Sequence, residues 1–341
     1  MARSFFYERK RLFPKCQRLF TDRFVKHTAI AFLAACPFVW ADVTVTEKAG
    51  AIAIAVDGQM VTEYRFGDAP HVYYYPLIGP GGVKMTRDYP MVKTDGEETD
   101  HVHHRSIWFS HGEVNGVDFW GEDASYKGTP KHPVGKIEHD GVVKASGGKE
   151  AGVLETKQKW TAPDGSVPIR GTQLFRVHAG AATERVVDFE ITLTAGDKDV
   201  VFGDTKEGTA GIRIAESMRL KQPKGPGKGT ITNSEGHADG KAWGQKAKWV
   251  TMTGPIGDKT YSITMMDHPS NLRHPTRWHA RDYGLFAANP FCESEMDKTK
   301  EKGAGAHTLK AGQSLTLKYR MAFTEGDAAA SKASERFAAW K

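Results

Sequence analysis

The chain has 341 residues, with 47 Lys and Arg against 41 Asp and Glu, and a formal net charge of +6. The whole excess lies in residues 1–26, which hold eight basic and two acidic side chains, so the remainder carries 39 of each and is formally neutral. A neutral body lacks the basic surface by which proteins bind nucleic acid, and we expect no nucleic-acid partner.

The N-terminal segment is predicted to be an export signal. Its basic stretch is followed by an apolar run, "AIAFLAACPFVW", and by a small residue, Ala41. This order is typical of a secretory signal peptide, and the run is too short for a membrane span, which needs roughly 20 apolar residues. We therefore predict a signal peptide over 1–41, a mature chain that begins at Asp42 and a secreted or periplasmic bacterial protein. A lipid anchor on Cys36, in the lipoprotein-like sequence "LAAC", is the second choice.

From residue 43 onward the sequence alternates apolar and polar residues with a period of two. The clearest runs are "VVDFEITLT" at 186–194 and "LTLKYRMAF" at 315–323. Weaker runs occupy 50–56, 59–66, 71–77, 151–160, 172–178, 210–220 and 259–266. Strands with one polar face, separated by glycine-bearing turns, indicate antiparallel sheets packed face to face. We predict an all-β fold, with one large antiparallel β-sandwich over 42–325 and a short C-terminal helix over 326–341.

Two segments do not alternate and are expected to be long loops. Residues 79–130 are rich in Gly, Asp, His and Trp, and residues 267–293 hold three each of Pro, His and Arg. Loops of this length in a compact domain are usually functional.

The first of these segments contains "HVHHRSIWFSHG" at 101–112. If residues 101–104 are extended, His101 and His103 point to one face and His104 to the other. Neutral imidazoles suit a divalent transition metal, but no cupin-type glutamate follows the pair and no H-E-x-x-H motif is present. Three interpretations stay open: a metal site with His101 and His103 as ligands, a histidine-lined substrate site without a metal, and structural histidines in a polar loop.

Aromatic and polar side chains interleave in both segments. Sugars present C–H faces to aromatic rings and hydroxyls to polar side chains, so this mixture favours a carbohydrate site, although each large ring also suits a buried core position. A third feature is Glu216, which the alternation of "GIRIAESMRLK" places on an apolar face. Burial would raise the pKa of an unpaired carboxylate there, whereas an ion pair with an arginine would make it structural.

We therefore assign two groups of candidate site residues. The candidate catalytic residues are His101, His103, Arg105, His111, Glu216, Asp267, His268 and Arg281. The candidate substrate-binding residues are Trp108, Asn115, Trp120, His274, Trp278, His279, Tyr283 and Asn289. A histidine from 101–111 is the expected general acid, Glu216 or Asp267 the expected base, and Arg105 and Arg281 are expected to hold an anionic group.

The histidine cluster is predicted to divide between two tasks. At least one of His101 and His103 should share a cavity with Glu216 and the 267–282 loop. His104 should turn towards the sheet interior or a backbone acceptor, and His111 lies too far along the chain to join the others.

The segments "DHVHHRSIWFSHGEVNGVDFW", "GIRIAESMRL", "WGQKAKWV" and "DHPSNLRHPTRWHARDYGLFAANPF" resemble a family of secreted bacterial proteins labelled "methane oxygenase PmoA". The label implies a membrane-spanning copper enzyme subunit, whereas this chain has no spanning segment after its leader and alternates as β-proteins do. The resemblance therefore implies no reaction and no catalytic residues. A broader resemblance to galactose-mutarotase-like sandwiches implies a large sandwich that presents histidines and a glutamate to a sugar.

Taken with the residues, these patterns predict a secreted carbohydrate-active protein that performs acid–base chemistry on a sugar, of epimerase, lyase or hydrolase type. The expected partner is a carbohydrate small molecule or a glycan, with no membrane span. No cofactor is expected. One alternative is a metal-dependent enzyme with a divalent ion on His101 and His103, and another is a non-catalytic carbohydrate-binding protein.

Overall fold

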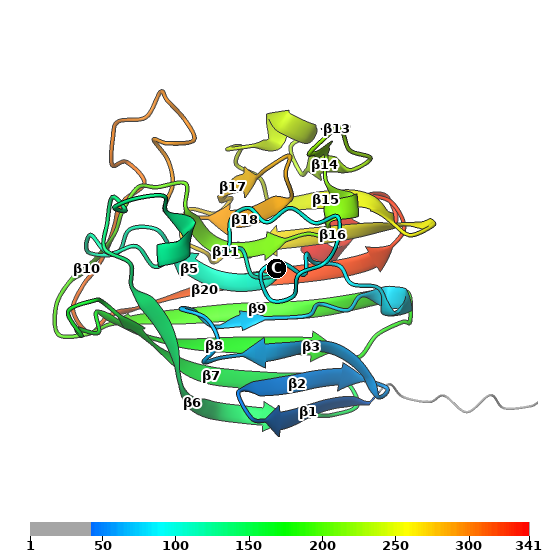
Figure 1. The fold of residues 1–341 in the computed structure, drawn as a ribbon, viewed down its shortest axis with the longest axis horizontal. Helices are drawn as coiled ribbons and strands as arrows, with labels where there is room; N and C mark the ends of the chain where they lie inside the picture. Colours follow the sequence, from blue (N-terminus) through cyan, green and yellow to red (C-terminus); the bar gives the residue numbers. More distant parts are fainter. Residues whose placement is uncertain (1–41, 341) are drawn as a thin grey trace, which may run out of the picture. The chain divides into compact units, whose positions relative to one another are not determined.

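The computed structural model describes residues 42–340, and the predicted signal peptide and Cys36 lie outside them. The described chain is built on two eight-stranded antiparallel sheets (Figure 1). The first sheet has the order β1 (Val43–Lys48), β2 (Ala51–Val56), β3 (Gln59–Arg65), β4 (Tyr73–Tyr74), β5 (Ile107–His111), β11 (Gly208–Arg213), β18 (Leu285–Asn289) and β17 (Arg277–Ala280). The second sheet has the order β14 (Thr230–Asn233), β15 (Trp249–Ile256), β16 (Lys259–Asp267), β20 (Ser314–Glu325), β9 (Glu184–Ala195), β8 (Ile169–His178), β7 (Ala151–Thr161) and β6 (Lys136–Ser146).

Smaller elements complete residues 42–340. Two short strand pairs are β10 (Val200–Phe202) with β19 (His307–Leu309), and β12 (Lys221–Gln222) with β13 (Gly225–Pro226). The helical segments are the 3₁₀ helices η1 (Pro80–Gly82), η2 (Asp123–Ser125), η3 (Glu216–Met218) and η4 (Asp239–Ala242), and the α-helix α1 (Ala333–Trp340). No helix in this part of the chain has the length and apolar character needed to cross a membrane.

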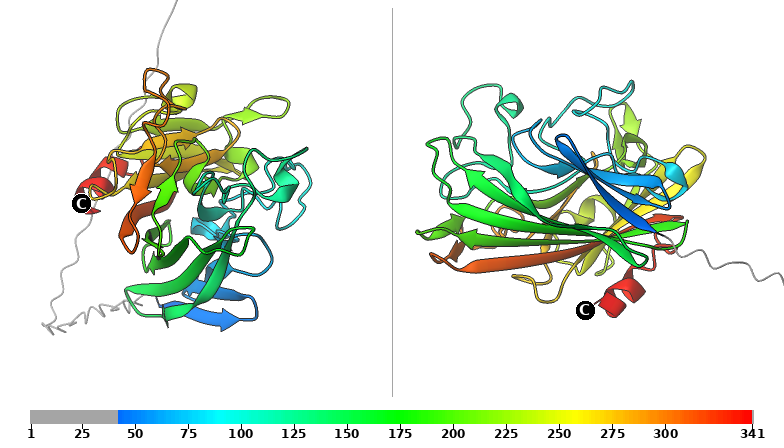
Figure 2. Two further views of the ribbon diagram at one scale, coloured as in Figure 1. Left: turned by 90° about the vertical axis from the view of Figure 1, so that its left-hand side faces the viewer. Right: turned by 90° about the horizontal axis from the view of Figure 1, so that it is seen from below.

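The two sheets pack face to face and bury the main core between them, as the right-hand view in Figure 2 shows. In β9, Val187, Phe189 and Ile191 lie in this core, where full burial of such a side chain contributes about 1.5–3 kcal/mol. In β20, Leu317 and Tyr319 face them from the neighbouring strand. The predicted all-β antiparallel sandwich is confirmed.

The C-terminal helix is shorter than the predicted 326–341 segment, because α1 begins at Ala333 after a series of turns. It packs on the outer face of the second sheet, away from the blue strands β1–β3 in the right-hand view of Figure 2. Phe337 stacks on His274, and the Trp340 ring lies 5.1 Å from the Arg320 guanidinium carbon.

The two segments predicted to be loops contain strands of the first sheet, and that prediction is wrong in part. Residues 79–130 hold β5, and residues 267–293 hold β17 and β18. Every residue of these three strands is buried, so both of their faces are covered and their sequences do not alternate. Conversely, the weak 210–220 run ends as a strand at Arg213, and the 71–77 run holds only the two-residue β4.

The first sheet buries side chains on its outer face as well as in the main core. In β5, Ile107 and Phe109 face the core, whereas Trp108 belongs to a second cluster on the opposite face. The Trp108 ring packs directly over Gly211 of the neighbouring strand β11, where an added Cβ would lie 2.8 Å from the indole. Glycine at 211 is therefore needed for close contact between the indole and the sheet.

We predict that Gly211→Ala destabilises the protein by about 1–3 kcal/mol, because the added methyl overlaps the Trp108 ring. Urea denaturation followed by circular dichroism measures the effect. Gly240→Ala is the matched control, since nothing lies within 4 Å of a Cβ there. Equal stability of the two variants would contradict this account of the packing.

His111 lies at the end of β5 and is fully buried, with Nε2 donating to the carbonyl of Gly203 at 2.9 Å. Burial lowers the pKa of His111 to about 4. The unfolded chain takes up a proton near pH 6.5 that the native state does not accept until about pH 4. The unfolding free energy therefore falls as the pH drops between these values.

We predict that His111→Gln reduces this loss of stability by about 2 kcal/mol between pH 7 and pH 5. Urea denaturation of both proteins at the two pH values gives the difference. An identical pH dependence in the variant would contradict the lowered pKa, because it would show that His111 binds its proton equally well in the native and unfolded states.

Candidate functional site

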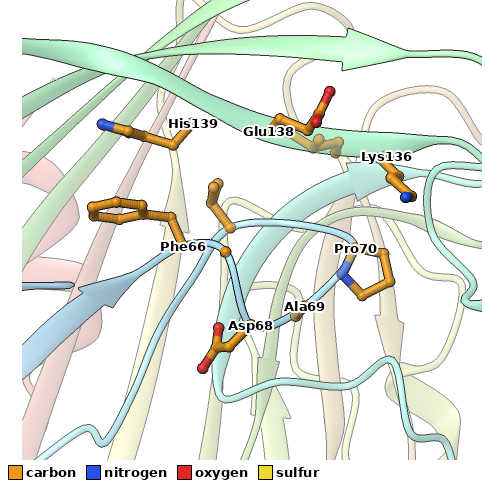
Figure 3. Close-up of a pocket in the computed structure, with 10 residues that line it drawn as sticks. Phe66, Asp68, Ala69, Pro70, Lys136, Glu138 and His139 are labelled. Carbon is orange, nitrogen blue, oxygen red and sulfur yellow. The ribbon is translucent and has the colours of Figure 1, made fainter. Parts of the chain in front are cut away.

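A cleft of about 690 Å³ lies where β6 approaches the chain that follows β3 (Figure 3). Its two rings, Phe66 and His139, stack on each other at 4.2 Å, and Nδ1 of His139 is 3.2 Å from the Tyr64 hydroxyl. Glu138 is paired with Lys159 at 3.7 Å. His139, Glu138 and Asp68 bond residues beside the cleft, and no candidate site residue lines it.

A second cleft, of about 470 Å³, brings together both segments singled out by the sequence. It is lined by His101, His103, Trp120, Ser125, Tyr126, Lys206, Glu207, His279, Arg281 and Tyr283. Six of these ten are candidate site residues. The cleft lies against the outer face of the first sheet, where β17 and the segment before β11 contribute residues.

Residues 101–104 form a turn instead of the expected extended segment. His101 has a φ of 45°, and the amide of His104 donates to the carbonyl of His101 at 2.9 Å. Within this turn the rings of His101 and His104 stack, with centroids 4.7 Å apart. The ring of His104 also stacks on that of Trp108, with centroids 5.2 Å apart. On the cleft side, His101 also stacks on Tyr283 at 4.9 Å. His104 is therefore buried beneath the cleft, with Nδ1 3.2 Å from Arg213.

The imidazole of His101 is held by Asp100, with Nδ1 2.6 Å from a carboxylate oxygen. The other oxygen of Asp100 accepts from Arg213 at 2.9 Å and from Arg87. Burial alone would raise the pKa of Asp100. The hydrogen bond from His101 and the two guanidinium charges outweigh burial and hold that pKa well below its usual range. Asp100 is therefore ionised, and Nε2 of His101 is left for a ligand.

His103 and His279 present buried, uncharged imidazoles to the cleft. Burial lowers the pKa of each to about 3. Nδ1 of His103 is 2.8 Å from Oγ of Ser125, and Nδ1 of His279 donates to the carbonyl of Lys206 at 2.9 Å. This leaves Nε2 of His279 as a buried acceptor without a partner among the described residues. Both rings suit hydrogen bonding to a neutral group better than proton donation.

Glu216 does not line the cleft, which corrects the prediction from alternation. Because β11 ends at Arg213, Glu216 falls in the helix η3 and its carboxylate pairs with Arg219. Burial raises the pKa of Glu216, and the arginine charges oppose the shift. Its second oxygen lies 4.0 Å from Arg213 and 3.9 Å from Arg87, so Glu216 reaches His101 only through these arginines and Asp100. The structure agrees with the alternative of an ion pair.

Asp267 is also remote from the cleft and cannot be the base expected there. It is fully buried at the end of β16, where its carboxylate accepts from Asn271 at 2.7 Å and from the amide of Thr276 at 3.0 Å. Nδ1 of His274 lies 2.7 Å from the same carboxylate. His268 bonds Ser270 and packs against Trp340 of α1. These residues fix the loop after β16 and its contact with the helix.

The remaining candidates lie in structural positions. Arg105 forms a buried two-point ion pair with Glu122, at 2.9 Å for each contact, so it is not free to hold an anion. Trp278 is in the main core, and Asn289 and Asn115 bond backbone groups. His111 is at the end of β5 that is farther from the turn at residues 101–104. Trp108 lies beneath His104, below the cleft.

Sequence reasoning missed several residues of this cleft. Asp100 directly precedes the histidine cluster, and the pairing of an acidic residue with an adjacent histidine was the available signal. Ser125 is the last residue of η2 and Tyr126 follows it, and Lys206 and Glu207 precede β11. Nothing in the local pattern of these four residues distinguishes them from surface loops.

Among residues 42–340, no three His, Cys, Asp or Glu side chains are grouped so that they could hold a metal ion. His101 and His103 have ring centroids 5.8 Å apart, and with their described neighbours they do not form such a group. The metal-dependent alternative stays a prediction, to be tested by metal analysis.

No curated protein matches this chain. Among solved structures, a GalM/aldose epimerase homologue from C. elegans matches at 8% identity and a TM-score of 0.31, over 84% of this chain and 99% of that one. Galactose 1-epimerase from Lactobacillus acidophilus matches at 8% identity and a TM-score of 0.36, over 84% and 98%. A polysaccharide lyase matches at 14% identity and a TM-score of 0.31, over 84% of this chain and 33% of its own. Similarity this low carries no argument about the site.

The label "methane oxygenase PmoA" receives no support from these comparisons. A family model described as a family of unknown function (DUF6807) matches residues 51–338, most of the chain, and the protein therefore belongs to this family.

Proposed function

We propose that the cleft lined by His101 and Tyr283 binds a carbohydrate, and that His101 transfers a proton to or from it. The observation that carries the proposal is the Asp100–His101 pair at the cleft wall. A carboxylate on one imidazole nitrogen orients the ring and favours the tautomer in which the other nitrogen is available for proton transfer.

The setting of this pair supports a catalytic role. The side chains of Arg87 and Arg213 are both 0% exposed and are aimed at the Asp100 carboxylate. Because these arginines are fixed by burial, the carboxylate and the imidazole that it orients are held in place before a ligand enters. Such preorganisation lowers the cost of reaching the transition state.

The other cleft residues support a sugar as the ligand. Tyr126, which is 36% exposed, offers a ring surface for the C–H face of a pyranose, and the more buried rings of Trp120 and Tyr283 line the same cleft. His103 and His279 are uncharged, and they suit hydrogen bonds with neutral hydroxyls. A concave site with aromatic walls and a few converging polar groups is the usual form of a small-molecule site.

A second proton-transfer group is available in the same cleft. Glu207 is the one carboxylate among the described residues that line the cleft, and it pairs with Lys206 at 2.7 Å. In this proposal His101 and Glu207 take the acid and base roles that sequence reasoning gave to a histidine with Glu216 or Asp267. Epimerisation, elimination and glycoside hydrolysis all use two such groups.

We expect His101→Gln to lower the turnover of a sugar substrate by about 10²- to 10⁴-fold, because it removes the proton-transferring nitrogen. Neutral and acidic mono- and disaccharides are incubated with the protein in D₂O and followed by proton NMR. This detects deuterium uptake at carbon, changed anomeric exchange and released reducing ends in one experiment. Thermal unfolding of the same variant checks that the fold is retained.

His178→Gln is the matched control, because Nε2 of His178 lies 2.7 Å from Asp188 on the second sheet, away from the cleft. It should leave turnover unchanged. Full activity of His101→Gln would exclude His101 as the acid or base. Sugar binding without any turnover by the unmodified protein would favour the non-catalytic alternative, and turnover that needs a tightly bound metal would favour the metal-dependent one.

A further inference from the structure

Arg281 follows β17 and lines the cleft without an ionic partner. Its guanidinium carbon lies 5.3 Å from the centroid of the Tyr283 ring and 5.8 Å from that of Trp243. Within residues 42–340, no carboxylate lies within 4.0 Å of this guanidinium, and it donates no hydrogen bond to another described group. Its donors are therefore available to a ligand.

Three other arginines of the first sheet and its loops, unlike Arg281, each form an ion pair with a carboxylate. Arg105 is paired with Glu122, Arg213 with Asp100, and Arg277 with Glu293, each at 2.9 Å or less. A cation in a partly enclosed site is costly unless an opposite charge compensates it. Arg281 lacks such a partner among the described residues, so its donors can bind an anion from outside them.

The two aromatic rings fix the guanidinium in position. A guanidinium lying over aromatic faces gains about 0.5–2 kcal/mol, and this contact leaves its in-plane N–H donors free. Those donors form a planar fork that matches two oxygens of one carboxylate. Arg281 is thus prepared for two-point binding of a planar anion.

No carboxylate near the cleft forms an ion pair with Arg281 among the described residues. Glu207 and Glu295 are directed at Lys206, at 2.7 Å and 3.8 Å. The two buried imidazoles are uncharged at neutral pH. Asp100 is occupied by His101 and two arginines. A neutral ligand would leave the N–H donors of Arg281 without a charged acceptor, whereas a carboxylate would accept from two of them.

Arg281 and His101 contact the same ring. Their distances of 5.3 Å and 4.9 Å are both measured to the Tyr283 centroid, so the two groups are no farther apart than these distances taken together. One or two linked sugar rings bridge such a separation. The neutral acceptor Nε2 of His279 lies in the same cleft and suits a sugar hydroxyl.

We infer that the sugar bound in this cleft carries a carboxylate, as a uronic acid does, and that Arg281 binds that carboxylate. The inference rests on the proposed carbohydrate function and narrows its substrate class to acidic sugars. The carboxylate lies at Arg281 and the reacting part of the sugar lies towards His101.

The test measures binding of the methyl glycosides of glucuronic acid and glucose, and of glucose 6-sulfate, by isothermal titration calorimetry. We expect the unmodified protein to bind the glucuronide at least about tenfold more tightly than the glucoside. Arg281→Gln should weaken glucuronide binding by about 10- to 100-fold and leave glucoside binding unchanged. Arg281→Lys, which keeps the charge and loses the fork, should retain part of the preference.

Arg176→Gln is the matched control, since Arg176 lies on β8 of the second sheet, away from the cleft. It should bind both glycosides as the unmodified protein does. Equal affinity for glucuronide and glucoside, or an unchanged preference in Arg281→Gln, would overturn the inference and leave the proposed function standing. Tighter binding of the sulfate ester than of the glucuronide would overturn the carboxylate assignment. Failure to bind any of these sugars would contradict the proposed function itself.

Discussion

The candidate site depends on two arginines that are wholly buried. A buried guanidinium must be paired and hydrogen-bonded, because an unpaired charge in a protein interior costs several kcal/mol. Arg87 satisfies this requirement through Asp100 and through the carbonyls of Tyr89, Glu98 and His101. These bonds fold the segment before β5 around one side chain. The position of the His101 imidazole follows from them.

Arg213 links this segment to the sheet. It is the last residue of β11, and its guanidinium reaches both Asp100 and Nδ1 of His104. The end of β11 therefore places the positive charge of Arg213 beneath the turn formed by residues 101–104. Loss of either arginine would leave Asp100 with a single buried cation and would release the carboxylate that orients His101. The two buried arginines therefore determine where the histidines of the site lie.

In the first sheet, several strands are covered on both faces, so their sequences do not alternate. One face of β5, β11 and β18 contributes to the core between the sheets, and the other supports Trp108 and the cleft. The second sheet has a polar outer face over most of β8 and β9, where residues alternate. The cleft lies on the outer face of the first sheet, where the aromatic rings of the second cluster and the loops around them line it, whereas α1 covers part of the outer face of the second sheet.

The sequence by itself determined the sandwich and the two segments that meet at the cleft. β9 and β20 were predictable because each has one polar face, and His101, His103, His279 and Arg281 were predictable as a concentration of residue types in two segments. The strands β5, β17 and β18 were not, because burial on both faces removes alternation. Only the tertiary structure decided that Asp100 holds His101, that Glu216 and Asp267 are occupied elsewhere, and that Arg281 has no partner. Those outcomes depend on strand order and on turns such as that at His101, which bring together groups more than a hundred residues apart, and no local pattern encodes such contacts.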